Sequence, residues 1–260
     1  MARIPRQVCI PVLIMRLPIV FSVLLLVLTA SASRADDSNP FPSGTVVAAR
    51  MMERDAQRQS LAAGYQGMRR YILDNELTHK HAEILVHIDC GADGIKHFEL
   101  VSQSGWKGAY KHVVSKMLES EAEASHPDVR SRIRLGPENY EFHMLRSALL
   151  DDRIAYLLEV TPRRREERLF EGRVWIDAQD YAVARIEGEP ARNPSFWIRS
   201  VHFTHTYQKS GPIWFPVTTE SVNEVRIFGA TTLTIDYFDY KPNLPPSPDT
   251  ARADAEGGQK

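Results

Sequence analysis

The sequence predicts an α+β protein built on one large antiparallel β-sheet. About ten segments alternate apolar and polar residues with a period of two, the pattern of strands with one buried face. Short turns separate most neighbouring segments, as in antiparallel hairpins. Only two segments have helical spacing, and they do not alternate with the strands, which argues against a parallel sheet. A sheet of this size is expected to curl or close.

The predicted elements follow in a simple order. A helix begins after Ser43, a suitable cap, and covers residues 44–55; a three-strand meander follows. A second helix covers Lys107–Ala124, and we expect His126-Pro127 to end it. Seven further strands complete the sheet. The ten predicted strands are Arg69–Asp74, Ala82–Ile88, Lys96–Val101, Tyr140–Ala148, Arg153–Thr161, Arg168–Ile176, Tyr181–Glu187, Phe196–Gln208, Ile213–Phe228 and Thr231–Tyr240.

The N-terminus has the pattern of a cleaved secretory signal over residues 1–35. Basic residues precede an apolar core, Leu17–Leu28, and small residues follow it. The alternative is an uncleaved anchor, which needs about 20 consecutive apolar residues, whereas this core is shorter and contains Pro18. We therefore expect a periplasmic protein with one domain over 36–241 and a disordered tail over 242–260.

Charge and cysteine content narrow the function. Removal of residues 1–35 lowers the count of basic residues from 32 to 28 against 33 acidic ones, a formal charge of −5. This charge gives no indication of nucleic-acid binding. Cys90 is then the one remaining cysteine, so an intramolecular disulfide is impossible and the core must supply the stability.

Two phrases carry a resemblance to a known family. Residues 170–181 read FEGRVWIDAQDY, similar to a hairpin of the form v-W-I-D-x-x-x-Y, and residues 211–216 read GPIWFP, similar to a G-x-W-x-P step from turn to strand. With the order of elements over residues 44–240, they resemble the periplasmic lipoprotein carriers of the Lol type, most of all the outer-membrane lipoprotein-sorting branch.

The resemblance implies a strongly curved, half-open antiparallel sheet, an incomplete barrel whose concave face is covered by helices. It implies a cavity that holds the acyl chains of a lipoprotein or lipid, with transient contacts to inner- and outer-membrane components and no cofactor. The same fold also serves envelope-stress sensors and lipid-binding proteins, so a sensor that reads lipid through the same cavity is the alternative.

Apolar and aromatic residues that recur at every second strand position are the candidate cavity lining. The alternative is a filled core with no space for a ligand. The candidate lining residues are Phe170, Val174, Ile176, Trp197, Val201, Phe203, Tyr207, Phe215, Val217, Val225, Ile227, Leu233 and Ile235.

The second helix is the candidate lid. Tyr110, Val114, Met117 and Leu118 share its apolar side and are expected to touch cargo or lining, unless the helix is permanently packed on the sheet.

Three arginines interrupt the apolar faces. Arg69, Arg70 and Arg199 are candidates for a latch that bonds the lid's backbone carbonyls, or for headgroup contacts; the alternative is that they are outward-facing charges. In characterised carriers an arginine acts as such a latch.

No catalytic motif is recognisable, and we expect no enzymatic activity. His79, His81, His87, Asp89 and Cys90 are close in sequence, but strand alternation scatters them between faces, so we expect no metal site. Cys90 has no base at a spacing that would make it a nucleophile. The run Arg163-Arg164-Arg165 is interpreted as a solvated connection, with an anionic headgroup or acidic partner as the alternative.

Overall fold

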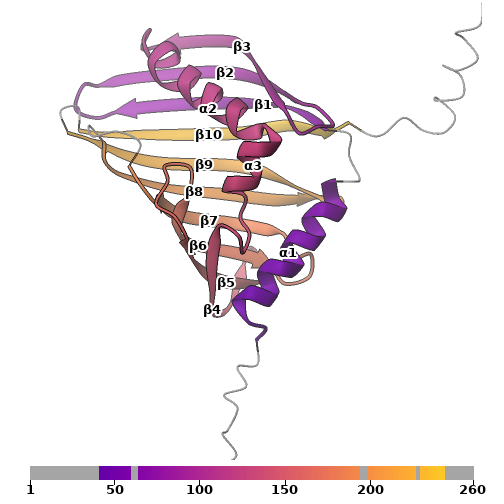
Figure 1. Cartoon of the computed structure of the whole chain (residues 1–260). Helices are drawn as coiled ribbons and strands as arrows, with labels where there is room; N and C mark the ends of the chain where they lie inside the picture. Colours follow the sequence, from indigo (N-terminus) through magenta and orange to yellow (C-terminus); the bar gives the residue numbers. More distant parts are fainter. Residues whose placement is uncertain (1–40, 60–63, 194–197, 227–228, 244–260) are drawn as a thin grey trace, which may run out of the picture. The chain divides into compact units, whose positions relative to one another are not determined.

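Ten antiparallel strands form one open sheet in the computed structural model of the chain (Figure 1). The structure describes residues 41–59, 64–193, 198–226 and 229–243. The strand order is β3-β2-β1-β10-β9-β8-β7-β6-β5-β4, so β3 and β4 are the edges and the sheet does not close into a barrel. The strands are β1 Tyr65–Asn75, β2 Lys80–Cys90, β3 Lys96–Gly105, β4 Tyr140–Leu150, β5 Arg153–Pro162, β6 Phe170–Asp177, β7 Val183–Pro190, β8 Ile198–Ser210, β9 Ile213–Val225 and β10 Gly229–Pro242.

These strands confirm the predicted fold class, a curved half-open sheet with few helices. The predicted secretory signal and the residues 244–260 of the predicted tail lie outside the described residues. No helix in the described part of the chain is long and apolar enough to cross a bilayer.

The helices lie on one face of the sheet, and those between β3 and β4 carry the chain from one edge to the other (Figure 1). They are α1 Gly44–Gln59, the π-helical turn η1 Tyr110–Val114, α2 Ser115–Ser125 and α3 Pro127–Ile133. Helix α2 ends before His126-Pro127 as predicted, but a further helix, α3, begins there and was not predicted. His126 is extended, but Pro127 takes the first position of a new helix, where its missing N–H costs nothing.

Helix α1 covers β4, β5 and β6. Ser43 caps it as predicted, since its hydroxyl accepts the Val46 N–H at 3.4 Å. A Cβ on Gly44 would lie 2.5 Å from the Phe142 carbonyl oxygen, so only glycine permits this approach to β4. The buried residues of the helix and of the chain beneath it form a group that we call the α1 cluster: Val47, Met51, Tyr140, Met144, Leu158, Val160, Leu169, Val174, Ile176 and Ala191.

Helix α2 and η1 cover β1, β2 and β10 at the other end of the sheet. Alternate residues of each strand point beneath the helix, as the period of two requires. The buried residues, here the α2 cluster, are Tyr71, Leu73, Ala82, Ile84, Val86, Ala109, Val114, Leu118, Leu233 and Ile235.

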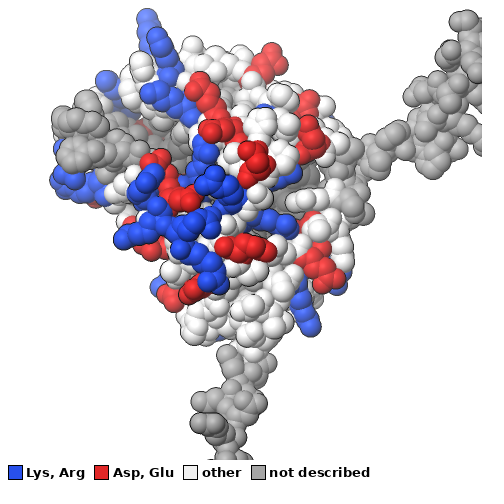
Figure 2. Space-filling view, viewed as in Figure 1, with Lys and Arg blue, Asp and Glu red and all other residues white. Residues whose placement is uncertain are grey.

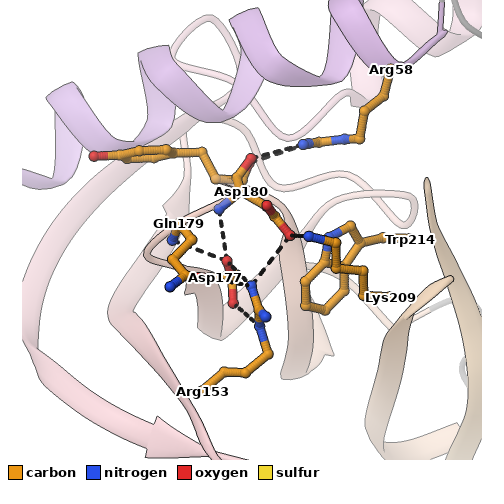
Figure 3. A network of polar contacts seen from close by, with 8 residues as sticks. Arg58, Arg153, Asp177, Gln179, Asp180, Lys209 and Trp214 are labelled. Carbon is orange, nitrogen blue, oxygen red and sulfur yellow. Dashed lines mark hydrogen bonds and ion pairs between the residues drawn. The ribbon is translucent and has the colours of Figure 1, made fainter. Parts of the chain in front are cut away.

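A polar network ties the ends of three hairpins together (Figure 3). The Asp177 side chain is 1% exposed and binds Arg153 in a bidentate pair, at 2.6 and 2.9 Å. The same carboxylate accepts the backbone N–H groups of Gln179 and Asp180, at 3.0 and 2.7 Å. Aspartate is favoured in such a turn because its carboxylate accepts nearby backbone N–H groups.

The neighbouring carboxylate extends the network to β8, β9 and α1. Oδ2 of Asp180 accepts Lys209 Nζ at 2.8 Å and Trp214 Nε1 at 3.1 Å. The Asp180 carbonyl accepts Arg58 at 2.8 Å, which anchors the last turn of α1 to the sheet. Helix α1 is therefore fixed by polar contacts at its end as well as by its apolar side.

Replacing Asp177 tests the strength of this network. Asp177→Ala removes four hydrogen bonds and leaves the Arg153 guanidinium only its longer contacts to Asp180 and Gln179, so we expect the free energy of unfolding to fall by about 2–3 kcal/mol. Urea unfolding measures the change. Glu171→Ala, at an exposed position of the same strand, is the control and should stay within about 0.5 kcal/mol of the parent protein. Equal effects of the two substitutions would contradict the assignment.

Candidate functional site

An ion pair joins the candidate lid to the sheet. Arg69, on β1, is 3% exposed and lies beneath α2. Its guanidinium binds both oxygens of Glu121, on α2, at 2.7 and 3.0 Å. Lys96 of the edge strand β3 binds the same carboxylate at 2.7 Å. One carboxylate on the helix thus holds cations from two strands.

Aromatic residues enclose the Arg69 guanidinium. It lies over the rings of Phe98 and Tyr237, 5.4 and 5.0 Å from their centroids, and Nε donates to the Tyr240 hydroxyl at 2.9 Å. Cation–π contacts and hydrogen bonds stabilise a guanidinium that has left water. Its position on the sheet is therefore fixed independently of α2.

The local field keeps both partners charged. Burial alone would raise the pKa of Glu121, but the Lys96 ammonium and the Arg69 guanidinium lower it to about 2. Burial would likewise lower the pKa of Arg69, and the Glu121 carboxylate outweighs it and raises that pKa. The pair is therefore fully ionised at neutral pH, where its attraction is greatest.

A band of rings crosses the helix-bearing face from the α1 cluster to the α2 cluster. At one end, Tyr140, Phe170, Phe203 and His205 follow one another with centroid distances of 5.3, 5.8 and 5.1 Å. At the other end, Tyr240 lies 5.5 Å from Tyr65, 5.5 Å from Phe215 and 6.1 Å from Tyr237. We call these rings the aromatic band: Tyr65, Tyr140, Phe170, Phe203, His205, Phe215, Tyr237 and Tyr240.

A polar relay on the middle strands connects the two ends of the aromatic band. The Thr219 hydroxyl lies 2.6 Å from Nδ1 of His205 and 2.9 Å from the Tyr237 hydroxyl. Burial lowers the pKa of His205 to about 4, so the imidazole is neutral at physiological pH. The surface between the two clusters is therefore aromatic, with neutral polar groups.

The predicted lining residues divide among several places. Phe170, Val174 and Ile176 lie in or against the α1 cluster, whereas Leu233 and Ile235 lie in the α2 cluster. Phe203 and Phe215 belong to the aromatic band, and Val201 is half-buried on β8.

The remaining lining residues do not join these groups. Tyr207 and Val217 border a separate cleft of about 440 Å³ beside the hairpin network. Trp197, Ile227 and the side chain of Val225 lie outside the described residues.

The predicted lid residues are brought together beneath η1 and α2. Val114 and Leu118 are buried in the α2 cluster, and Tyr110 and Met117 pack against it partly buried. Here the apolar side of the lid contacts the sheet directly.

The three predicted arginines have different surroundings. Arg69 meets the lid through the Glu121 side chain rather than through the backbone carbonyls expected of a latch. Arg70 points to the opposite face, where it binds Asp236 at 2.8 Å with 46% of its side chain exposed. Arg199 is exposed, and its carbonyl accepts the Asn193 amide at 3.0 Å. Of these three arginines, Arg69 is the one that binds the lid helix.

Glu121 was missed in the sequence, although a signal for it exists. Val114, Leu118, Glu121 and Ser125 follow one another at spacings of four, three and four, which is one stripe of a helix. A carboxylate on an otherwise apolar stripe needs a buried cation. Lys96 and the polar relay were also missed, because their partners lie far away in the sequence.

The described residues contain no group of three His, Cys, Asp or Glu side chains able to hold a metal. Cys90 is free and buried, and burial raises the pKa of its thiol, which disfavours the reactive thiolate.

Removing the charge of Glu121 should loosen α2. Glu121→Gln leaves Arg69 buried without its counter-charge, so we expect amide exchange in residues 110–125 to rise roughly 10- to 100-fold, as expected for a charged bond of about 1.5–3 kcal/mol. Hydrogen–deuterium exchange with mass spectrometry measures the change. Glu119→Gln, at an exposed position of the same helix, is the control. Unchanged protection in Glu121→Gln would show that the pair does not hold the helix.

The same ion pair predicts a pH dependence. The pKa of Glu121 in the folded protein lies below its ordinary value of 4.5, so the pair stabilises the docked helix above about pH 4.5. This stabilisation is lost as the pH falls toward about 2. Exchange of residues 110–125, corrected for the intrinsic rate, should show this acid step in the parent protein and lack it in Glu121→Gln. An identical step in both proteins would assign it to other groups.

Comparison with known proteins gives a family match and several structural matches. The family DUF5686, a family of unknown function, matches residues 136–239. No curated protein matches the chain.

Three solved structures illustrate the structural similarity. A DUF1329 family protein from Desulfovibrio piger is 12% identical with a TM-score of 0.47, covering 80% of this chain and 96% of that one. A LolA superfamily protein from Nitrosomonas europaea is 12% identical with a TM-score of 0.38, covering 81% and 98%. A putative outer membrane lipoprotein-sorting protein domain from Vibrio parahaemolyticus is 13% identical with a TM-score of 0.39, covering 80% and 98%.

Proposed function

We propose that the protein binds the acyl chain of a lipid or lipoprotein on the aromatic band and carries it through the periplasm without covalent chemistry. The observation that carries this proposal is the docking of α2 through ion pairs: Glu121 binds Arg69 and Lys96, and Glu123 binds Arg168. A helix docked by ion pairs over an apolar stripe is suited to move. The periplasmic location rests on the predicted secretory signal at residues 1–35.

The aromatic band supplies a surface of the right chemistry. Phe170, Phe203 and Phe215 contribute rings to the aromatic band, and all three are only partly buried. An acyl chain laid across the rings gains contact with apolar surface along its whole length. The hydroxyls of Tyr237 and Tyr240 already have partners, so this surface exposes few unsatisfied polar groups to the chain.

The energetics favour reversible binding. Burying a chain of ~15 methylenes at ~0.8 kcal/mol each yields about 12 kcal/mol, which would make release slow. Lifting α2 exposes Val114 and Leu118, at a cost of about 1.5–3 kcal/mol each, and breaks the Arg69–Glu121 pair, at a further cost of about 1.5–3 kcal/mol. The difference of about 3–7.5 kcal/mol corresponds to a dissociation constant between millimolar and micromolar. The lid therefore weakens binding to a range in which a carrier can unload.

The alternative function is a sensor that reads lipid through the same surface. A sensor would use the same acyl site. Lipid binding would then change its affinity for a protein partner. A carrier instead transfers bound lipid to acceptor membranes. The uptake experiment below tests the acyl site that both functions need, and a transfer assay to acceptor vesicles then separates them.

Substitution of one ring tests the proposed site. We expect Phe203→Ala to weaken uptake of fluorescent hexadecanoate about 10- to 100-fold, because one aromatic contact contributes about 1.5–3 kcal/mol. Phe238→Ala is the matched control, since Phe238 is 38% exposed on β10 and points away from its neighbour Tyr237. Fluorescence titration without detergent measures both affinities. Absence of uptake by the parent protein, or an equal loss of affinity in both variants, would contradict the proposed site.

A further inference from the structure

Arginines from separate segments form one exposed surface on the helix-bearing face. Figure 2 shows Lys and Arg side chains gathered in the middle of this face, around α3. Helix α3 and the residue after it supply three arginines, and the connection between β5 and β6 supplies three more. We call these residues the arginine surface: Arg130, Arg132, Arg134, Arg163, Arg164 and Arg165.

Hydrogen bonds hold the two segments of the arginine surface together. Arg164 donates to the Arg132 carbonyl and to Oδ1 of Asn139, both at 2.8 Å. The Asn139 amide, in a residue that is 3% exposed, donates to the carbonyls of Ser131 and Arg134, at 3.1 and 2.9 Å. The arrangement of positive charges is therefore built into the fold.

Several of these charges have no neutralising carboxylate. Arg163 and Arg164 pair with Glu141 and Glu166, each at 2.9 Å. Arg130, Arg134 and Arg165 are exposed and have no carboxylate within 4 Å among the residues that the structure describes. The whole chain has a formal charge of −1, so this local excess does not follow from an overall positive charge.

We infer that the arginine surface docks on the anionic headgroups of a bilayer. Guanidinium groups form bidentate hydrogen bonds with phosphate oxygens, and each arginine near an anionic membrane adds attraction that salt screens. Every basic residue of α3 and of the connection between β5 and β6 is an arginine rather than a lysine. The inference concerns where the protein docks, which goes beyond the proposed binding of an acyl chain.

The composition of the arginine surface favours a bilayer over an acidic protein. Stable protein interfaces centre on buried apolar anchors surrounded by a polar rim. Within the described part of this surface, the apolar side chains Ile133 and Leu135 are turned inward against the α1 cluster. The exposed groups of this surface are therefore charged. A bilayer presents anionic groups over a wide area and does not require an apolar anchor.

Docking in this way sets the orientation of the protein. The arginine surface and α2 lie on the same face of the sheet (Figure 1). Arg168, in the same connection as Arg163–Arg165, binds Glu123 of α2 at 2.5 Å, so the two regions are in contact. A membrane that binds the arginine surface therefore faces the lid.

Vesicle binding tests this inference. The full-length mature protein is sedimented with vesicles of phosphatidylcholine alone or with about 30 mol% phosphatidylglycerol. We expect binding only to the anionic vesicles and loss of binding as salt rises from about 0.05 to 0.5 M. Binding of both vesicle types alike, or of neither, would overturn the inference. So would binding that salt does not weaken.

Variants of equal charge locate the surface that binds. We expect Arg130→Gln/Arg134→Gln/Arg165→Gln to weaken partition roughly 100-fold, from about fivefold per arginine. The control Arg70→Gln/Arg146→Gln/Arg173→Gln removes three exposed arginines of strands β1, β4 and β6 and should bind as the parent protein does. Equal weakening in both would assign binding to net charge and contradict the inference.

Separate assays test docking on a bilayer and the proposed binding of an acyl chain, so one can fail without the other. Uptake of fluorescent hexadecanoate without vesicles reports the aromatic band and should be unchanged when the arginine surface is altered. Phe203→Ala should weaken uptake and keep binding to anionic vesicles. Capture of a soluble acidic protein in place of vesicles would assign the arginine surface to a protein partner instead.

Discussion

The burial of Arg69 is the constraint on which the described structure depends most. A guanidinium on an otherwise apolar face cannot stay unpaired, because an uncompensated buried charge costs several kcal/mol. Its carboxylate partner comes from Glu121, so α2 must lie over β1 and β10 for the sheet to be stable in this form. The same pair makes the helix position conditional, since a group that satisfied Arg69 in another way would release the helix.

The two helix-covered ends of the sheet are held by different interactions. Helix α1 packs on an apolar cluster and is anchored by hydrogen bonds from Arg58 to backbone carbonyls, whereas α2 packs on its own apolar cluster and is anchored by the ion pairs of Glu121 and Glu123. Ion pairs weaken with salt and with competing charged groups, so the anchoring of α2 responds to its surroundings. We therefore assign movement to α2 and the fixed framework to α1, with the aromatic band between them as the surface that opening exposes.

Much of the fold could be predicted from the sequence, because the hydrophobic period and the turn residues are local signals. The ten strands and the Ser43 cap follow from such signals. Helix α3 could not be predicted, since Pro127 equally ends one helix and begins the next. The site was predicted only in part: Arg69 and Phe203 stood out by residue type, but Glu121, Lys96 and Thr219 gain meaning only when the sheet brings distant strands together.

Native mass spectrometry of the protein recovered from the periplasm without detergent tests the central claim most directly. A carrier whose lid weakens acyl binding should appear as two populations, one free and one with a single added lipid mass. Fragmentation of the added mass should yield fatty acyl chains. Protein that is always lipid-free, and that stays so after incubation with excess hexadecanoate, would contradict the account and leave the aromatic band as a filled core.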